Sequence, residues 1–392
     1  MKKKFLWMFM VAAAAMTSCS SFDEPAVMDG DGDALSRAGE PRAAGYATTE
    51  AELRTQLSGN RNPIYVSADV SLTEDLEINR EVTISSVDNG KITSTASIIC
   101  NANVVFQDMT IDANTPLGTG AIALGAEDIT VTLDNVKLTQ NAIGTEDARS
   151  KAGIAIKYEA YNNNLVIKNN TVITMPSNKY VRAIDMLPSE TASVKGIEIT
   201  GSTISIGTDP KFPSTYSRGV SFSNITCDNF VIDSSTLEGA YYIINVNGSS
   251  VVNANVRNNS TLSGRCGFNI WSTDFTATVD NSTIVGKNNW SGSMETFANV
   301  VINTTAERSN LTFINTTFKM DVSNEYQTNR QYAIQYRASD QTLLVKGVTT
   351  VIDTPENAVS AYVVANAGVS GIKASVEDFT FNSADANCKN FF

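Results

Sequence analysis

The 392-residue sequence contains no histidine. This absence removes the commonest general base and metal ligand, together with every system in which histidine activates a serine or cysteine nucleophile. Cysteine is scarce too, and the five cysteines show no Cys-x-x-Cys spacing, so we expect no metal and no cofactor. Beyond the N-terminal region the cysteines are Cys100, Cys227, Cys266 and Cys388. The sequence leaves open whether Cys227 and Cys266 form a disulfide or all four remain buried free thiols.

Basic residues are fewer than acidic ones, 29 against 41. Without the three lysines at positions 2–4 the balance is 26 against 41, a net charge of −15. Such a surface repels phosphate backbones, so we expect no nucleic-acid partner. Long apolar runs are also missing. The longest at the N-terminus, residues 5–15, is too short to span about 30 Å of hydrocarbon as a helix.

The N-terminus nevertheless has the layout of a secretion signal. Three lysines precede the apolar run, and Met16-Thr17-Ser18-Cys19 follows it. Small residues before a cysteine at this place resemble the lipobox of bacterial lipoproteins, in which the cysteine is acylated and the preceding peptide is removed. The resemblance implies that residues 1–18 are a signal peptide and that lipidated Cys19 anchors the protein to a membrane. The alternative is an ordinary secretory signal with a chance cysteine.

Acidic residues soon after the cysteine, Asp23 and Glu24, resemble the surface-export signal of Bacteroidetes lipoproteins. This resemblance implies an outer-membrane lipoprotein exposed at the cell surface. The following residues, to about 46, are rich in Ala, Gly, Asp, Pro and Arg and hold almost no large apolar side chains. That composition cannot bury a core, so residues 19–46 are predicted to be a flexible tether. Residues 47–392 are long enough for one large domain.

An internal repeat dominates this domain. Each copy reads apolar, any residue, apolar, any residue, a small turn residue, any two residues, then mostly apolar. The second apolar position, which we call the anchor, is held by Phe106, Leu133, Ile167, Ile199, Ile232, Val256, Val279, Phe313, Val345 and Val376. The turn position is held by Asp108, Asn135, Asn169, Gly201, Ser234, Asn258, Asn281, Asn315, Gly347 and Asp378. All ten turn residues are of types that tolerate left-handed or tight-turn backbone.

The spacing predicts how the chain stacks. Alternation places the two apolar residues on one face of a strand, and the turn residue bends the chain back toward the same interior. Anchors recur every 23 to 34 residues, which suits a coil of three short strands. Stacked coils pair their strands in parallel and bury a continuous apolar column, and the asparagines of the turn column are expected to form amide ladders. This pattern resembles the right-handed parallel β-helix of the pectate-lyase-like superfamily, over residues 60–382, and implies an all-β fold of about 10–11 coils.

The N-terminal end of the domain carries a helix signal. Thr49 and Glu52 stand at capping-box spacing and predict a short helix to about Leu57 that covers the end of the core. Residues 64–66 and 82–84 are then the first expected strands. A β-sandwich or a string of immunoglobulin-like modules is the alternative architecture, but it does not explain the turn column.

A second series of strands precedes the anchors, and its outward residues are the candidate ligand-binding site. Strand alternation predicts that a polar and aromatic strip faces outward from these strands: Lys157, Asp185, Ser221, Tyr241, Asn245, Asn269, Trp271, Gln335 and Arg337. Amides, cations and exposed aromatic rings are typical of sugar-binding surfaces, because rings stack on sugars while amides and arginine bind hydroxyls and carboxylates.

Three functional hypotheses remain. The first is a non-catalytic, glycan-binding or adhesin-like surface lipoprotein that takes a polysaccharide or a host glycan. The second is a polysaccharide lyase or glycoside hydrolase, with Lys157 or Arg337 and Asp185 as the candidate catalytic residues. A hydrolase needs two carboxylates about 5–9.5 Å apart, and Asp185 has no acidic partner in the strip. The third hypothesis is a solvated face that binds nothing. The sequence gives neither the ligand nor the oligomeric state.

Overall fold

The computed structural model describes residues 44–145, 152–186, 192–207, 217–287, 297–321, 331–352 and 359–382. The predicted signal peptide, the lipidation site Cys19 and most of the predicted tether lie outside these residues, as does Cys388. Two of the 19–46 tether residues prove to be structured, because strand β1 spans Gly45–Ala47. The folded domain therefore begins slightly earlier than the predicted residue 47.

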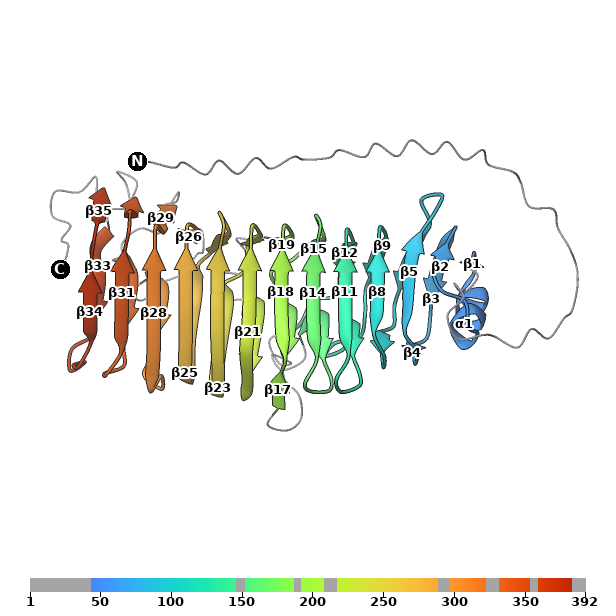
Figure 1. Cartoon of the computed structure of the whole chain (residues 1–392), viewed down its shortest axis with the longest axis horizontal. Coiled ribbons are helices and arrows are strands. Elements are labelled where there is room, and N and C mark those ends of the chain that lie inside the picture. The colour runs from blue at the N-terminus through green and yellow to red at the C-terminus, as the bar shows by residue number, and fades with distance from the viewer. Residues whose placement is uncertain are drawn as a thin grey trace, which may run out of the picture. The chain divides into compact units, whose positions relative to one another are not determined.

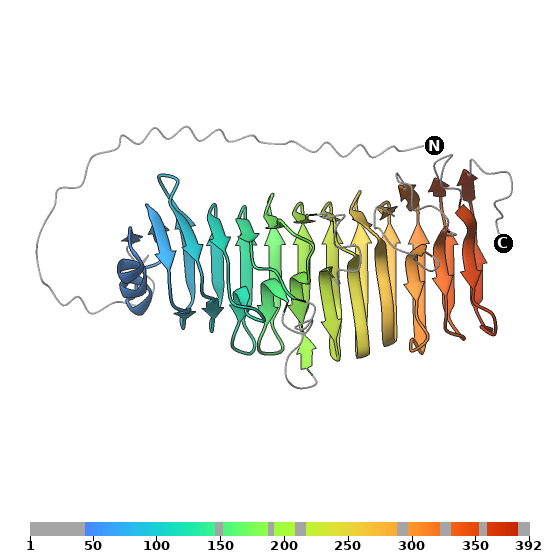
Figure 2. The ribbon, with the colours of Figure 1, turned by 180° about the vertical axis from the view of Figure 1, so that it is seen from behind.

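Parallel strands stack side by side from a helical end to the last strand (Figures 1 and 2). They form a 23-stranded and a 12-stranded sheet in which every pairing is parallel, which confirms the predicted all-β parallel β-helix. The 23-stranded sheet has two faces, joined where β23 (Tyr242–Arg257) and β25 (Cys266–Asp280) run from one face to the other. Within the described residues, β4 to β35 form eleven coils, in agreement with the prediction.

The first face lies ahead of the anchors in each coil. Besides the N-terminal parts of β23 and β25, it contains β4 (Leu76–Ile78), β7 (Ile98–Cys100), β10 (Gly120–Leu124), β13 (Gly153–Tyr158), β16 (Val181–Met186), β20 (Arg218–Ser223), β27 (Phe297–Ile302), β30 (Gln331–Tyr336) and β33 (Val359–Ala365).

The second face carries the anchors. Besides β1 and the C-terminal parts of β23 and β25, it contains β2 (Ile64–Val66), β5 (Val82–Ser86), β8 (Val104–Gln107), β11 (Thr130–Asp134), β14 (Asn164–Lys168), β17 (Ala192–Val194), β18 (Gly196–Thr200), β21 (Ile225–Asp233), β28 (Arg308–Ile314), β31 (Thr342–Lys346) and β34 (Lys373–Val376). Strands β2 and β5 confirm two strands that the sequence predicts, although β1 precedes them and β3 and β4 lie between them.

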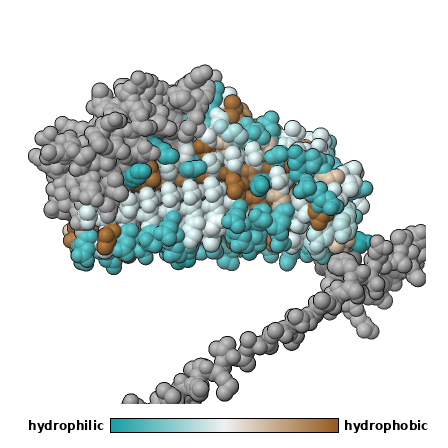
Figure 3. All heavy atoms as spheres, turned by 90° about the horizontal axis from the view of Figure 1, so that it is seen from above, coloured by the Kyte–Doolittle hydropathy of each residue, from teal (hydrophilic) through white to brown (hydrophobic). Residues whose placement is uncertain are grey.

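The third face is the 12-stranded sheet. It contains β3 (Asp69–Leu72), β6 (Lys91–Ser94), β9 (Thr110–Ala113), β12 (Lys137–Gln140), β15 (Val172–Met175), β19 (Thr203–Ile206), β22 (Thr236–Glu238), β24 (Thr261–Gly264), β26 (Thr283–Lys287), β29 (Thr317–Asp321), β32 (Thr349–Ile352) and β35 (Phe379–Asn382). One register position of this sheet is threonine in seven consecutive strands, from Thr203 to Thr380. In the view from above, weakly polar residues form pale rows along the molecule (Figure 3).

The turn column is the most regular feature of the backbone. All ten predicted turn residues have positive φ, from 45° at Asn281 to 64° at Gly347. At six of the ten positions the backbone N–H of the turn residue donates to a carbonyl of the next coil, as from Asn281 to Ile314 O at 2.9 Å. Nine of the ten anchors are buried in one continuous core, and Val376 of the last coil is partly buried. The single left-handed residue therefore returns each strand to the same interior.

The predicted amide ladder of the turn column is not what the structure shows. Three of its asparagines donate instead to carboxylates of the preceding coil: Asn135 to Asp108 at 2.7 Å, Asn169 to Asp134 at 2.8 Å and Asn258 to Asp233 at 2.9 Å. A charged acceptor forms the stronger hydrogen bond, so the amide prefers it. Burial alone would raise the pKa of Asp233, but hydrogen bonds from Asn258, Arg257 and Ser234 hold this pKa below its usual value.

A second ladder, made of hydroxyls, lies inside the solenoid just after the turn column. We call it the hydroxyl ladder; its members, all buried, are Thr171, Ser202, Ser235, Ser260, Ser282, Thr316 and Thr349. Ser202 N donates to Ser235 Oγ at 3.1 Å, and Ser235 N donates to Ser260 Oγ at 3.2 Å. The ladder thus supplies acceptors to backbone N–H groups that the bend would otherwise leave buried without a partner.

Helix α1 (Glu50–Ser58) stands at the N-terminal end, as predicted, and buries Leu53 and Leu57 against the core. Thr49 is the N-cap, and its side chain accepts from Glu52 N at 3.2 Å. The reciprocal bond of a capping box is displaced by one residue, because Glu52 accepts from Thr48 N at 2.7 Å. Hydrogen bonds from Thr48 are also the main reason why the pKa of Glu52 is lowered.

Candidate functional site

Most of the predicted site residues lie in one line on the first face. Strand register aligns, in neighbouring strands, Lys157, Asp185, Ser221, Asn245, Asn269, Val301 and Gln335, which we call the central row. These side chains point away from the core, as alternation predicts. Val301 is the one apolar member.

The exposure of the central row differs from the prediction, which placed these side chains on an outward-facing strip. From Asp185 to Gln335 the central row is buried, with Asp185 only 2 % exposed. Longer side chains beside the row bind its polar groups: Arg182 Nη1 lies 2.8 Å from Asp185 Oδ1, and Arg337 Nη2 donates to Gln335 Oε1 at 3.1 Å. Alternation fixes the direction of a side chain but not what covers it. The central row is therefore not itself an open binding strip.

Three asparagines form an amide ladder on this face. Asn269 Nδ2 donates to Asn245 Oδ1 at 2.8 Å, and Asn303 Nδ2 donates to Asn269 Oδ1 at 2.8 Å. All three side chains are buried, and Asn245 Nδ2 at the end of the ladder has no hydrogen-bond partner. An amide ladder thus occurs on the first face, where Asn245 and Asn269 bind each other across strands, and not in the turn column as predicted.

The three candidate catalytic residues do not form one group. Lys157 and Asp185 are neighbours, but Lys157 Nζ binds Glu159 Oε1 at 2.6 Å, and Asp185 is held by Arg182. Arg337 lies in the strand of Gln335, six strands beyond Lys157 in the register. At about 4.8 Å per strand this is roughly 29 Å, too far for Lys157 and Arg337 to act on one bond.

Tyr241 is not part of the strip. It precedes β23, and only 8 % of it is exposed. The guanidinium of Arg265 lies over its ring at 4.3 Å from the centroid, and the ring of Tyr242 packs edge-on at 4.7 Å. Tyr241 therefore lies before the strand and is largely buried, and a role for it in ligand binding stays a prediction.

A more exposed line runs two residues after the central row. This edge row consists of Ser223, Asn247, Trp271, Asn303, Arg337 and Asn366. Trp271 is 37 % exposed, Asn247 and Arg337 are partly exposed, and Asn366 is exposed. Gln335 Nε2 donates to Asn366 Oδ1 at 3.1 Å, which ties the edge row to the central row.

Asn247, Asn303 and Asn366 are members of the edge row that sequence reasoning did not single out. A signal was present, because Asn247 and Asn303 each stand two residues after a central-row residue, as Trp271 and Arg337 do. Trp271 and Arg337 are two strands apart, about 10 Å, with the buried Asn303 between them. Apart from the buried Asn303, the edge row therefore presents an aromatic ring, a guanidinium and amides along one accessible line.

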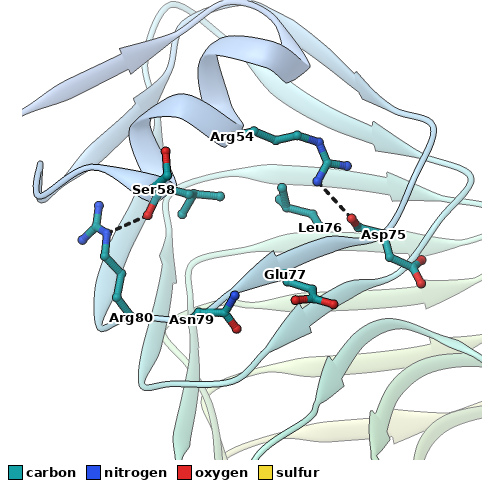
Figure 4. Close-up of a pocket in the computed structure, with 8 residues that line it drawn as sticks. Arg54, Ser58, Asp75, Leu76, Glu77, Asn79 and Arg80 are labelled. Atoms are coloured by element: carbon teal, nitrogen blue, oxygen red, sulfur yellow. Dashed lines mark hydrogen bonds between the residues drawn. The ribbon is translucent and has the colours of Figure 1, made fainter.

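A depression of about 480 Å³ lies between α1 and β4 (Figure 4). Its two arginines hold the cap in place: Arg54 Nη1 donates to Asp75 O at 3.0 Å, and Arg80 Nε donates to Leu57 O at 2.9 Å. Glu77 on β4 remains exposed at its side. Because the cations bind backbone carbonyls, this depression serves the helical cap rather than a ligand.

Among the described residues no group of three potential ligands from His, Cys, Asp and Glu could hold a metal ion. Cys100, Cys227 and Cys266 are buried free thiols, so Cys227 and Cys266 are not paired. In the described part of the chain no helix is both long enough and apolar enough to cross a membrane. No protein-family model matches this chain, and no curated protein matches it.

Proposed function

We propose that this protein is a surface-exposed outer-membrane lipoprotein of Bacteroidetes type that binds glycans, as an adhesin or a capture protein, without cleaving them. Its β-helix is then of the pectate-lyase-like kind. The observation that carries the binding proposal is the edge row, in which exposed Trp271 stands in line with Asn247, Arg337 and Asn366. An aromatic ring stacks on a sugar face, while arginine and amides bind hydroxyls and carboxylates.

Binding is tested with the full chain and two probes, oligogalacturonate for acidic and xylo-oligosaccharide for neutral glycans. Trp271→Ala is expected to weaken binding of the acidic probe at least tenfold, and Arg337→Gln is expected to weaken it too, while neither variant changes binding of the neutral probe. Tyr161→Ala is the matched control, because it removes another exposed ring (41 % exposed) elsewhere on the solenoid. If both Trp271→Ala and Arg337→Gln bind like the wild type, the edge row is not the site.

Turnover is measured in the same samples as unsaturated products and new reducing ends. Their appearance would establish the lyase or hydrolase alternative, and their absence with retained binding supports the proposal. Anchoring is tested separately with a clickable fatty acid, which should label the wild type in cells but not Cys19→Ser. Protease treatment of intact cells should then remove the protein if it faces outward.

A further inference from the structure

A second polar depression, of about 520 Å³, opens on the second face near its N-terminal end. Its lining is formed by Asn62, Pro63, Tyr65, Thr83, Ser85, Gln107 and Asp108. The strands involved, β2, β5 and β8, are neighbours in the sheet and lie at the blue end of Figure 1. The edge row belongs to the other face of the 23-stranded sheet, so the two sites do not overlap.

An aromatic platform adjoins this depression. Tyr46 on β1 is in register with Tyr65 on β2, and their ring centroids lie 5.4 Å apart. Tyr46 is 59 % exposed, the highest value among the exposed tyrosines of the described chain. Register continues the line through Ser85 to Gln107, so two rings, a hydroxyl and an amide follow one another over four strands. At about 4.8 Å per strand the line is roughly 14 Å long.

Of the polar side chains on β5 and β8 that line the depression, Thr83 and Gln107 are partly exposed and Ser85 is 9 % exposed. Within the described chain, no hydrogen bond engages the side chains of Thr83, Ser85 or Gln107, although all three line the depression. Uncommitted hydroxyls and amides beside an exposed aromatic ring match the two needs of a pyranose, whose ring hydrogens pack on an aromatic face while its hydroxyls form hydrogen bonds.

The charge of the lining selects the class of sugar. Asp108 is its one charged residue, its carboxylate is exposed, and no lysine or arginine lines the depression. A uronate would meet repulsion here, whereas a neutral sugar would not. We propose that Tyr46, Tyr65, Ser85 and Gln107 form a neutral-sugar site that holds two to three pyranose units. This proposal does not depend on the edge row.

The site is tested with the full chain and tetrasaccharides of glucose, mannose and xylose, with tetragalacturonate as the acidic probe, by calorimetry. At least one neutral probe is expected to bind, and Tyr46→Ala is expected to weaken it at least tenfold. Tyr46→Phe keeps the ring and should stay within about threefold. Because Tyr46 is largely exposed, Tyr46→Ala is expected to fold, and Gln107→Ala is a second, independent variant with the same expected direction.

Trp271→Ala separates the two sites, since it should leave this binding unchanged. The proposal fails if no neutral probe binds at 10 mM. It also fails if Tyr46→Ala and Gln107→Ala both bind like the wild type, or if the binding that Tyr46→Ala abolishes is that of tetragalacturonate. A loss of neutral binding in Trp271→Ala alone would assign that binding to the edge row and overturn the proposal.

Discussion

The hydroxyl ladder makes the sharpest prediction about stability. Ser235 lies at its centre and accepts from Ser202 N at 3.1 Å. Its own hydroxyl has a single proton and two carbonyl acceptors within reach, Asp233 O at 2.7 Å and Ile199 O at 3.1 Å. Ser235→Ala removes this acceptor and leaves the N–H of Ser202 buried without a partner. A buried donor left unsatisfied costs about 1–3 kcal/mol, so the free energy of unfolding should fall by that amount.

The loss should be local as well as global. Because each coil of a solenoid contacts only its neighbours, the bond between Ser202 and Ser235 belongs to one coil interface. Amide hydrogen exchange at Ser202 should therefore accelerate about 5- to 150-fold, which corresponds to about 1–3 kcal/mol. Distant members of the ladder, such as Thr349, should be less affected. The measurement is native-state exchange together with the midpoint of chemical denaturation.

Ser235→Thr is the matched control. It keeps the hydroxyl, and threonine already occupies the ladder at Thr171, Thr316 and Thr349, where all three side chains are buried. Because threonine fits at these equivalent positions, Ser235→Thr should destabilise the protein less than Ser235→Ala does. The reasoning is refuted if alanine and threonine at this position are equally destabilising, or if Ser235→Ala leaves the exchange of the Ser202 amide unchanged.

Three further predictions concern the turn column and the thiols. The pKa of Asp233 is lowered in the folded protein. The ionised carboxylate therefore stabilises the fold above its unfolded pKa of about 3.9, and this stabilisation is lost as the pH falls through the lower folded pKa. Thermal melts from pH 6 to 2 should show the wild type and Asp233→Asn converging in that window. Asn281 has a φ of 45°, a left-handed conformation that β-branched residues disfavour. Asn281→Val should therefore lower the free energy of unfolding by about 1–2 kcal/mol, whereas Asn281→Gly should lower it much less. Equal denaturation midpoints for the two variants would contradict this. Burial raises the pKa of Cys227 and Cys266 to about 12, so neither thiol should react with iodoacetamide at pH 8 until the protein unfolds, as site-resolved mass spectrometry can check.

The fold could be predicted from the sequence because its constraints repeat. Each anchor must pack on the anchors above and below, so Phe106 and Leu133 face each other in register and both are fully buried. The turn residue must adopt positive φ in every coil, which restricts it to a few residue types. A requirement that recurs ten times in one sequence is visible without any structure. Strands β1 and β4, which have no anchor, were not predicted.

The site was predictable in register but not in exposure. The sequence places Asp185, Asn245 and Asn269 on one line of the first face, and the strand pairings agree. Whether such a side chain reaches solvent depends on its neighbours, as when Arg182 covers Asp185. The residues that make these contacts do not recur at a regular spacing in the sequence, so the contacts could not be predicted from it. Trp271 and Arg337 were predicted to face outward, but that the open positions lie in the edge row became evident only from the three-dimensional arrangement.

Residues that stabilise the stacked coils follow a repeating pattern, whereas residues that could bind a ligand do not. In the hydroxyl ladder either serine or threonine can occupy a position, because each supplies the acceptor that the bend requires. Outside, the central row changes chemistry from Lys157 to Asp185 to Ser221 in consecutive strands. A stacking constraint would make such neighbours alike, as it does for the amides of Asn245 and Asn269. Positions that break the pattern and remain exposed, Trp271 and Tyr46 above all, are thus the places where selection for a ligand rather than for folding can act.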